Sequence, residues 1–133
     1  MSAFGALDAP LEGGCPCGAG ATYASCCQPL HEGSAFAESA LRLMRSRYAA
    51  YVVGDTAYLL RTWHPRTRPV DLDAATGPRW QGLTVLATAD GGEGDSVGEV
   101  EFEARYDGGV LHERSQFVTR AGRWVYVDGD AAR

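Results

Sequence analysis

The sequence predicts an α+β fold in which helices cover one face of a curved antiparallel sheet, with a cysteine-rich segment ahead of them. In the first half of the 133-residue chain apolar residues recur at helical spacing, and in the second half they alternate with polar residues. All four cysteines lie between Cys15 and Cys27, before both patterns. We therefore divide the chain into an appendage over residues 1–33 and a main domain over residues 34–133.

The helices are expected in the first half. Residues 1–14 form a loose leader, and the cysteine segment has room for one short helical turn over residues 22–27. A longer helix over residues 39–54 is capped at its start by a serine hydroxyl. A shorter helix over residues 56–63 ends before Pro65, which disfavours helical geometry in its predecessor. The apolar stripe of the longer helix consists of Leu41, Met44, Tyr48, Tyr51 and Val52.

Four strands are expected in the second half, over residues 80–89, 97–106, 111–119 and 124–128. The sequence Asp107-Gly108-Gly109 predicts a tight hairpin, because glycine adopts positive φ at little cost. The second strand alternates most regularly, which is typical of a sheet with one face against a core and one in water. Its apolar face holds Val100, Phe102, Ala104 and Tyr106, and its polar face holds Glu99, Glu101, Glu103 and Arg105.

The composition narrows the class of protein. Hydrophobic residues make up 45% of the chain and charged residues 22%, which is ordinary for a globular protein. The net charge of −5 argues against nucleic-acid binding, which depends on clustered cations. No apolar run approaches the ~20 residues of a membrane-spanning helix, and the first residues lack the pattern of a secretory signal. We therefore expect a cytoplasmic protein.

The cysteines have the spacing of a metal site. They form two close pairs, Cys15-x-Cys17 and Cys26-Cys27, separated by eight residues that include two glycines. Zn²⁺ prefers four thiolate or imidazole ligands in a tetrahedron, and a sharp loop can bring the two pairs together. The sequence predicts one structural zinc ion on the four cysteines. His31 lies close enough to replace one thiolate, and free thiols or a strained disulfide are the alternatives.

The segment CPCGAG, followed by Tyr23 and the closing Cys26-Cys27 pair, resembles the SEC-C motif known from the C-terminal tail of the preprotein translocase motor SecA. The resemblance implies a structural zinc ion. By analogy only, it also implies a surface for a protein partner such as the chaperone SecB or the ribosome. That tail is rich in Lys, whereas this segment contains none, so the identity of a partner stays open.

The resemblance extends along the rest of the chain, which is similar to the YchJ-like proteins, in which a SEC-C motif precedes a domain of the nuclear transport factor two-like superfamily. This family implies a cystatin-like cone: a curved antiparallel sheet around helices, with a pocket at its wide end. It implies no particular reaction. The similar segments are LMRSRYAAY (43–51), YLLRTWHP (58–65), WQGL (80–83), VEFEARY (100–106), HERSQF (112–117) and GRWVYVDGD (122–130).

A turn at residues 120–121 would set Glu113 opposite Asp128 on a face that should be apolar. Facing carboxylates need a proton or a cation between them, and Arg47 or Arg45 of the first helix could supply the cation. Ser115 would then face Tyr126, and Phe117 would face Trp124. The candidate pocket residues are therefore Arg47, Trp63, His64, Glu113, Ser115, Tyr126 and Asp128, although a purely structural role for them is the main alternative.

Two hypotheses follow. The first is a protein-binding or adaptor module with a structural zinc ion, because a four-cysteine site leaves no coordination position open for catalysis. The second is a small-molecule binder or enzyme that uses the cone pocket, with acid–base chemistry through Glu113, Asp128 and His64. A homodimer through the open sheet face is also possible, since this superfamily often dimerises.

Overall fold

The computed structural model describes residues 14–131, so nearly all of the predicted leader lies outside the described residues. Helices come first and strands follow, as the sequence predicts. Among the described helices, none is long and apolar enough to cross a membrane. The elements in chain order are η2 (Tyr23–Ser25), α2 (Gln28–Glu32), α3 (Ala40–Val53), α4 (Thr56–Arg61), η3 (Ala74–Thr76), β1 (Trp80–Asp90), β2 (Val97–Tyr106), β3 (Gly109–Arg120) and β4 (Arg123–Ala131).

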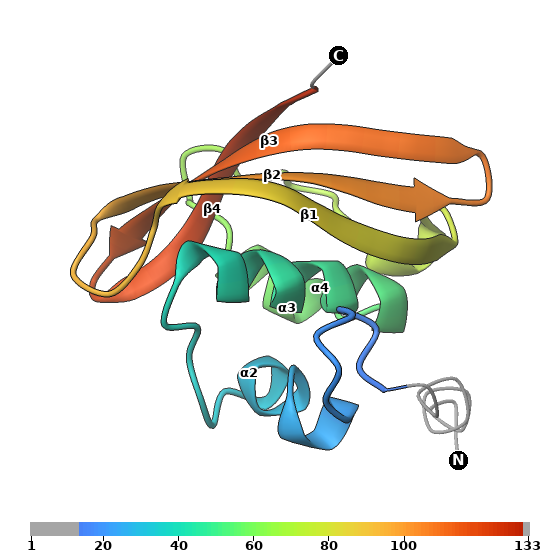
Figure 1. Cartoon of the computed structure of the whole chain (residues 1–133), viewed down its shortest axis with the longest axis horizontal. Coiled ribbons are helices and arrows are strands. Elements are labelled where there is room, and N and C mark those ends of the chain that lie inside the picture. Colours follow the sequence, from blue (N-terminus) through green and yellow to red (C-terminus); the bar gives the residue numbers. More distant parts are fainter. Residues whose placement is uncertain (1–13, 132–133) are drawn as a thin grey trace.

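The four strands form one antiparallel meander in the order β1-β2-β3-β4. Figure 1 shows three layers: the curved sheet, then α3 and α4 against its concave face, then α2 and the cysteine segment on the far side of α3. We call residues 14–33 the knuckle. The predicted α+β fold is therefore confirmed, and α3 is the element that separates the knuckle from the sheet.

Helix α3 begins and ends where the sequence predicts. The hydroxyl of Ser39 accepts a hydrogen bond from the amide of Arg42 (3.0 Å), and Gly54 closes the helix with a φ of 81°. The predicted stripe is incomplete: Val52 is exposed, whereas Leu43 and Ala50 are buried. A helix covered on two sides buries more than one stripe, so helical periodicity alone could not identify its core residues.

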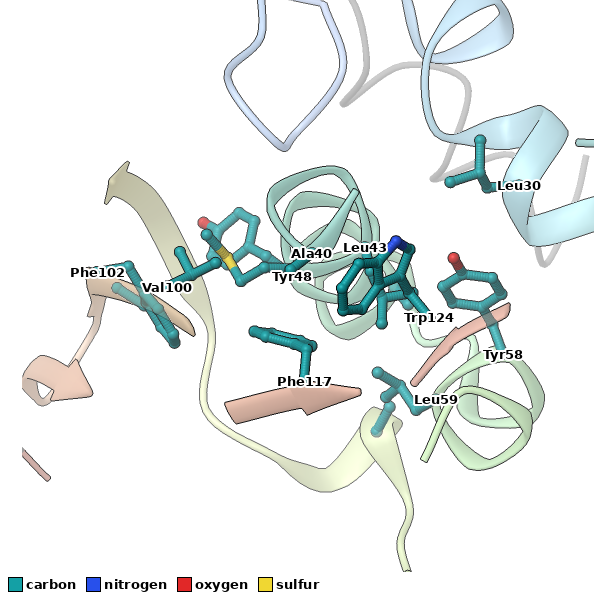
Figure 2. Close-up of a cluster of buried hydrophobic side chains, with 14 residues drawn as sticks. Leu30, Ala40, Leu43, Tyr48, Tyr58, Leu59, Val100, Phe102, Phe117 and Trp124 are labelled. Atoms are coloured by element: carbon teal, nitrogen blue, oxygen red, sulfur yellow. The ribbon is translucent and has the colours of Figure 1, made fainter. Parts of the chain in front are cut away.

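The apolar face of β2 packs on α3, as predicted, with Val100, Phe102 and Ala104 buried. Figure 2 shows how Phe117 and Trp124 from the last two strands meet Leu43 and Leu59 from the helices in the same cluster. This single core joins the sheet to both helices. Core substitutions from large to small cost about 2–5 kcal/mol, so we expect such changes in this cluster to destabilise the cone.

The N-terminus of α3 meets the β1–β2 hairpin at two buried glycines. The amide of Ala40 donates a hydrogen bond to the carbonyl of Gly91 (2.9 Å). A Cβ at Gly98 would lie 2.6 Å from the Cα of Gly91 and 2.8 Å from the Cβ of Ala40. Backbone approaches this close exclude any side chain. The glycines therefore set the distance between helix and sheet.

The predicted register of the last hairpin is wrong. Ala121 and Gly122, both with positive φ, make the turn, so Arg120 pairs with Arg123. A bulge between Gln116 and Phe117 then shifts the pairing by one further residue. As a result Glu113 pairs with Ala131, Ser115 with Gly129, Gln116 with Asp128 and Phe117 with Tyr126.

Candidate metal centre and pocket

The knuckle brings the four cysteine sulfurs together. All four ligand atoms lie within 4.8 Å of one another, and each cysteine is at most 8% exposed. The Sγ atoms of Cys17 and Cys26 are 3.6 Å apart, and those of Cys26 and Cys27 are 4.0 Å apart. In a zinc tetrahedron with Zn–S bonds of about 2.3 Å the sulfurs are about 3.8 Å apart. The donor set therefore fits a tetrahedral metal ion.

Local backbone features fold the knuckle into this shape. The amide of Cys15 donates to the carbonyl of Ala21 (2.8 Å), which closes a loop between the two cysteine pairs. Gly18 and Gly20 have φ values of 81° and 97° inside that loop. Thr22 then caps the short helix η2, which delivers the second cysteine pair. The structure therefore contains the sharp loop that the sequence predicts between the two cysteine pairs.

Arginines from α3 and α4 fasten the knuckle to the cone. Arg42 donates from Nη1 to the Sγ of Cys27 (3.4 Å) and from Nη2 to the carbonyl of Cys26. Arg45 donates to the carbonyl of Cys17 (2.7 Å). The sequence offered Arg45 as an alternative to Arg47 for the cation beside Glu113, and this alternative is therefore wrong. Arg61 donates to the carbonyl of His31 (2.6 Å).

Four thiolates around a divalent cation carry a net charge of −2, which guanidinium groups this close offset. Sequence reasoning missed Arg42 and Arg61 as partners of the cysteine segment. The three-residue spacing of Arg42 and Arg45, which puts them on one face of α3, was the available signal.

Because the four thiols are crowded, metal binding at this cluster would depend on pH. Hydrogen bonds with Cys17 raise the pKa of Cys15 to about 11, and bonds with Cys15 and Cys17 also raise the pKa of Cys27. The thiols donating to Cys17 lower its pKa to about 2, which concentrates the negative charge on that sulfur. A metal ion that binds here would therefore have to displace protons from Cys15 and Cys27, and its affinity would fall as the pH falls.

His31 is buried in the knuckle with both ring nitrogens occupied. Its Nδ1 atom accepts from the hydroxyl of Tyr23 (2.6 Å), and its Nε2 atom donates to the carbonyl of Ser46 in α3 (2.8 Å). This histidine therefore links the knuckle to α3, and the alternative of His31 as fourth metal ligand is not borne out. Burial lowers its pKa, because the charged imidazolium would lose its hydration.

The lowered pKa of His31 predicts a pH-dependent stability. Between the unfolded pKa of ~6.5 and the lower folded value, only the unfolded chain takes up a proton, so stability falls as the pH falls through that window. We expect His31→Gln to be less stable at pH 7.5 but to lose less stability than the native protein between pH 7.5 and 5.5. Urea unfolding at both pH values measures this, with His64→Gln as the matched control. An unchanged pH slope in His31→Gln would contradict the prediction.

On the opposite side of α3 a cavity of about 200 Å³ opens between the helix and the concave face of the sheet. We call it the cone pocket. Its walls are mostly aromatic, and its non-aromatic polar lining residues are Arg47, Glu113 and Ser115. Sequence reasoning missed several of its aromatic walls, because they belong to distant segments that the fold brings together. The aromatic lining residues are Tyr48, Tyr51, Trp63, Trp80, Phe102, Phe117 and Tyr126.

Arg47 is the buried cation of the cone pocket. Its side chain is 5% exposed, and its Nη1 atom donates to the carbonyl of Leu59 (2.9 Å) and the hydroxyl of Thr62 (2.8 Å). The guanidinium carbon lies 4.7 Å from the ring centre of Trp63 and 4.6 Å from that of Tyr126. Burial lowers its pKa to about 10, so the group stays charged at neutral pH.

Glu113 is the carboxylate of the cone pocket. Ser115 donates to its Oε2 atom from 2.7 Å, and the hydroxyl of Tyr126 donates to the same atom from 3.2 Å. A Cβ on Gly129 would clash with this carboxylate, so the glycine makes room for it. Burial, followed by the nearby Glu113 charge, raises the pKa of Tyr126, which therefore stays protonated as a donor.

Two sequence-predicted residues lie away from this lining. His64 follows α4, where its Nδ1 atom accepts from the amide of Arg66 (3.1 Å). Asp128 is exposed and pairs with Gln116, because the bulge in the last hairpin moved it away from Glu113. The predicted pair of facing carboxylates is therefore wrong. Of the predicted candidates, the cone pocket contains Arg47, Trp63, Glu113, Ser115 and Tyr126.

Trp63 adds an unsatisfied donor to the pocket wall. Its indole Nε1 is buried and has no hydrogen-bond partner among residues 14–131. Leaving a buried N–H unpaired costs about 1–3 kcal/mol, so such groups are few in native structures.

Known proteins share this architecture. The family described as the YchJ middle NTF2-like domain matches residues 39–129. A UPF0225 protein of Streptomyces coelicolor is 56% identical over 116 residues, which cover 87% of this chain and 94% of that protein. A UPF0225 protein of Deinococcus radiodurans is 50% identical over 119 residues, which cover 86% of each chain.

Two solved structures extend the similarity to the knuckle. The solution structure of a SEC-C motif containing protein from Rhodopseudomonas palustris is 39% identical, covers 90% of this chain and 99% of that one, and has a TM-score of 0.78. The crystal structure of a SEC-C motif containing protein from Psychrobacter arcticus is 28% identical, covers 92% and 85%, and has a TM-score of 0.72. The chain belongs to the YchJ-like family, in which relatives carry the UPF0225 designation.

Proposed function

We propose that this chain binds a small organic molecule in the cone pocket and that a structural zinc ion holds its knuckle in shape. Arg47 is the main support for ligand binding in the cone pocket, because its buried guanidinium has no ion-pair partner among the described residues 14–131. The charge of Glu113 acts on Arg47 only from beyond ion-pair distance, and burying a charge without a directly paired counter-charge costs several kcal/mol. A charge kept there at such a cost favours a site that uses it.

The donor chemistry supports zinc in the knuckle. Four thiolates in a tetrahedron are typical of structural zinc sites and leave no position for water or substrate. The ion would be held by Cys15, Cys17, Cys26 and Cys27, and it would contribute folding free energy and no reaction step. We place the protein in the cytoplasm, where a reducing environment keeps such thiols available. The division into a leader with the SEC-C-like zinc knuckle at residues 1–33 and a cone domain at residues 34–133 stays a prediction.

Glu113 is our candidate for acid–base chemistry, should the bound molecule react. Both described donors to Glu113 reach its Oε2 atom, which leaves Oε1 available to accept a proton from a ligand. His64 and Asp128 have no part in this proposal. The lining of the cone pocket contains one carboxylate, so any general base in it has to be Glu113.

Small-molecule binding can be tested with a diverse fragment library and NMR. We expect ligands of the cone pocket to shift the indole N–H signals of Trp63 and Trp80, which line it. The indole signal of Trp124, which packs in the core, serves as the internal control. A library in which no fragment shifts the first two signals selectively would contradict the proposal.

A second function, docking of a protein partner on the knuckle, is favoured by the exposure of residues 18–25, of which only Tyr23 is half-buried. This segment has no charged side chain, so it gives no specific support to SecB or the ribosome as the partner. The double variant Ala19→Glu, Ala24→Glu changes this surface without touching the cysteines. If it recovers the same partners from lysate as the native protein, the docking function is rejected.

A further inference from the structure

We propose that the ligand of the cone pocket is a single-ring organic carboxylate whose ring also carries a hydroxyl or amino group. Its carboxylate would lie at Arg47 and its hydrogen-bond donor at Glu113. This inference rests on the proposed small-molecule function and adds to it the chemical class of the ligand. We call Arg47 the cationic end and Glu113 the acidic end of the ligand site, because both line the pocket and carry opposite charges.

The size and lining of the cavity fit one ring. An engineered cavity of about 150 Å³ holds a benzene molecule, so the 200 Å³ of the cone pocket admits a ring with small substituents. Aromatic side chains form most of the wall. Aromatic rings prefer offset or edge-to-face contact with other rings, which favours a flat ligand over a branched aliphatic one.

The cationic end of the cone pocket requires an anion. Arg47 has five N–H donors, and the hydrogen bonds described for it use Nη1 alone. A carboxylate accepts two parallel hydrogen bonds from a guanidinium and supplies a counter-charge at ion-pair distance, closer than the charge of Glu113. Among residues 14–131, Arg47 has no such carboxylate partner. A ligand carboxylate would satisfy both the charge and the remaining donors.

The acidic end requires a hydrogen-bond donor. Ser115 and Tyr126 hold the Oε2 atom of Glu113, so Oε1 can accept one further hydrogen bond. A second ligand carboxylate at this end would be repelled, whereas a hydroxyl or amino group would donate to Oε1. Gly129 keeps the Glu113 carboxylate in position, because any side chain there would displace it. We therefore assign Gly129 as a positioning residue for the acidic end.

Four probes test the two ends separately: 4-hydroxybenzoate, benzoate, phenol and terephthalate. Quenching of tryptophan fluorescence measures the affinities, since Trp63 and Trp80 line the cone pocket. We expect 4-hydroxybenzoate to bind about tenfold or more tightly than benzoate or phenol, because each lacks one charge-assisted hydrogen bond. Terephthalate should bind most weakly. If a meta arrangement spans the two ends better, 3-hydroxybenzoate shows the same preference over benzoate.

Variants assign each preference to its residue. Glu113→Gln should weaken 4-hydroxybenzoate selectively and improve terephthalate, and Gly129→Ala should reduce the preference for 4-hydroxybenzoate over benzoate. Arg47→Met should abolish the preference for 4-hydroxybenzoate over phenol, with Arg68→Met, in an exposed loop, as the matched control. Should Arg47→Met fail to fold, the four probes measured on the native protein and on Glu113→Gln still test the ligand class.

These outcomes distinguish the proposed ligand class from the proposed small-molecule function. If phenol binds as tightly as the hydroxybenzoates, the ligand class is overturned while the small-molecule function stands. If the fragment library shows no selective shift at Trp63 and Trp80 either, the proposed function fails as well. If Arg47→Met lowers stability but keeps the carboxylate preference, Arg47 serves only to join α3 to α4, and the assignment of the carboxylate to this residue is wrong.

Discussion

Replacing Cys17 by Ser is expected to remove stoichiometric zinc from the purified protein and to release the knuckle from α3. Cys17 is fully buried, its sulfur lies 3.6 Å from that of Cys26, and its carbonyl accepts from Arg45. A structural zinc ion contributes on the order of 10 kcal/mol to the folding of small domains. Loss of one thiolate should therefore affect the knuckle more than any other single substitution in it.

Elemental analysis after dialysis measures the metal content, and amide hydrogen exchange measures knuckle docking. We expect about one zinc per native chain and near none in Cys17→Ser, with faster exchange over residues 14–33 and in the first turns of α3. Ala24→Ser, which adds the same hydroxyl to an exposed position of the knuckle, should retain the metal. Native-like zinc content in Cys17→Ser would contradict the assignment of this sulfur as a ligand.

Gly98→Ala is expected to destabilise the cone by about 3 kcal/mol, at the upper end of the usual cost of overpacking. The new methyl group would lie 2.6 Å from the Cα of Gly91 and 2.8 Å from the Cβ of Ala40. The first of these is backbone and cannot turn away. The β1–β2 hairpin and the start of α3 would have to move apart, which breaks the hydrogen bond from Ala40 to Gly91.

Thermal unfolding measures this effect, which corresponds to a fall in Tm of about 10 °C for a chain of this size. Gly92→Ala is the matched control, because the nearest atom to a Cβ at Gly92 is the Asp95 carboxylate at 4.0 Å. We expect the control to change Tm by about 2 °C or less. Equal effects of the two substitutions would show that the close approach of helix and hairpin does not limit stability.

The parts of the structure that depend on neighbouring residues could be predicted from the sequence. The cysteine cluster is one such part, because its ligands and glycines lie within one short segment. The boundaries of α3 are another, because the cap at Ser39 and the stop at Gly54 act locally. Strand alternation likewise identified the apolar face of β2. Each of these features needs information from only a few consecutive residues.

The cone pocket could be predicted only in part, because its residues meet through the register of distant segments. A one-residue error in the last turn and the bulge near Phe117 were enough to move Asp128 to the water-exposed face. Nothing in the sequence around Gly129 marked it as the space into which Glu113 folds. The contacts of Arg42 and Arg61 with the knuckle were missed for the same reason, since they join segments that the chain separates.

Helix α3 lies between the knuckle and the cone pocket, and consecutive residues serve the two sides. The carbonyl of Ser46 accepts from His31 of the knuckle, and the side chain of Arg47 forms the cationic end of the pocket. Thermodynamic reciprocity then requires that, if metal uptake tilts α3 and alters ligand affinity, ligand uptake alters metal affinity by the same factor. The two occupancies would then be linked through this one helix.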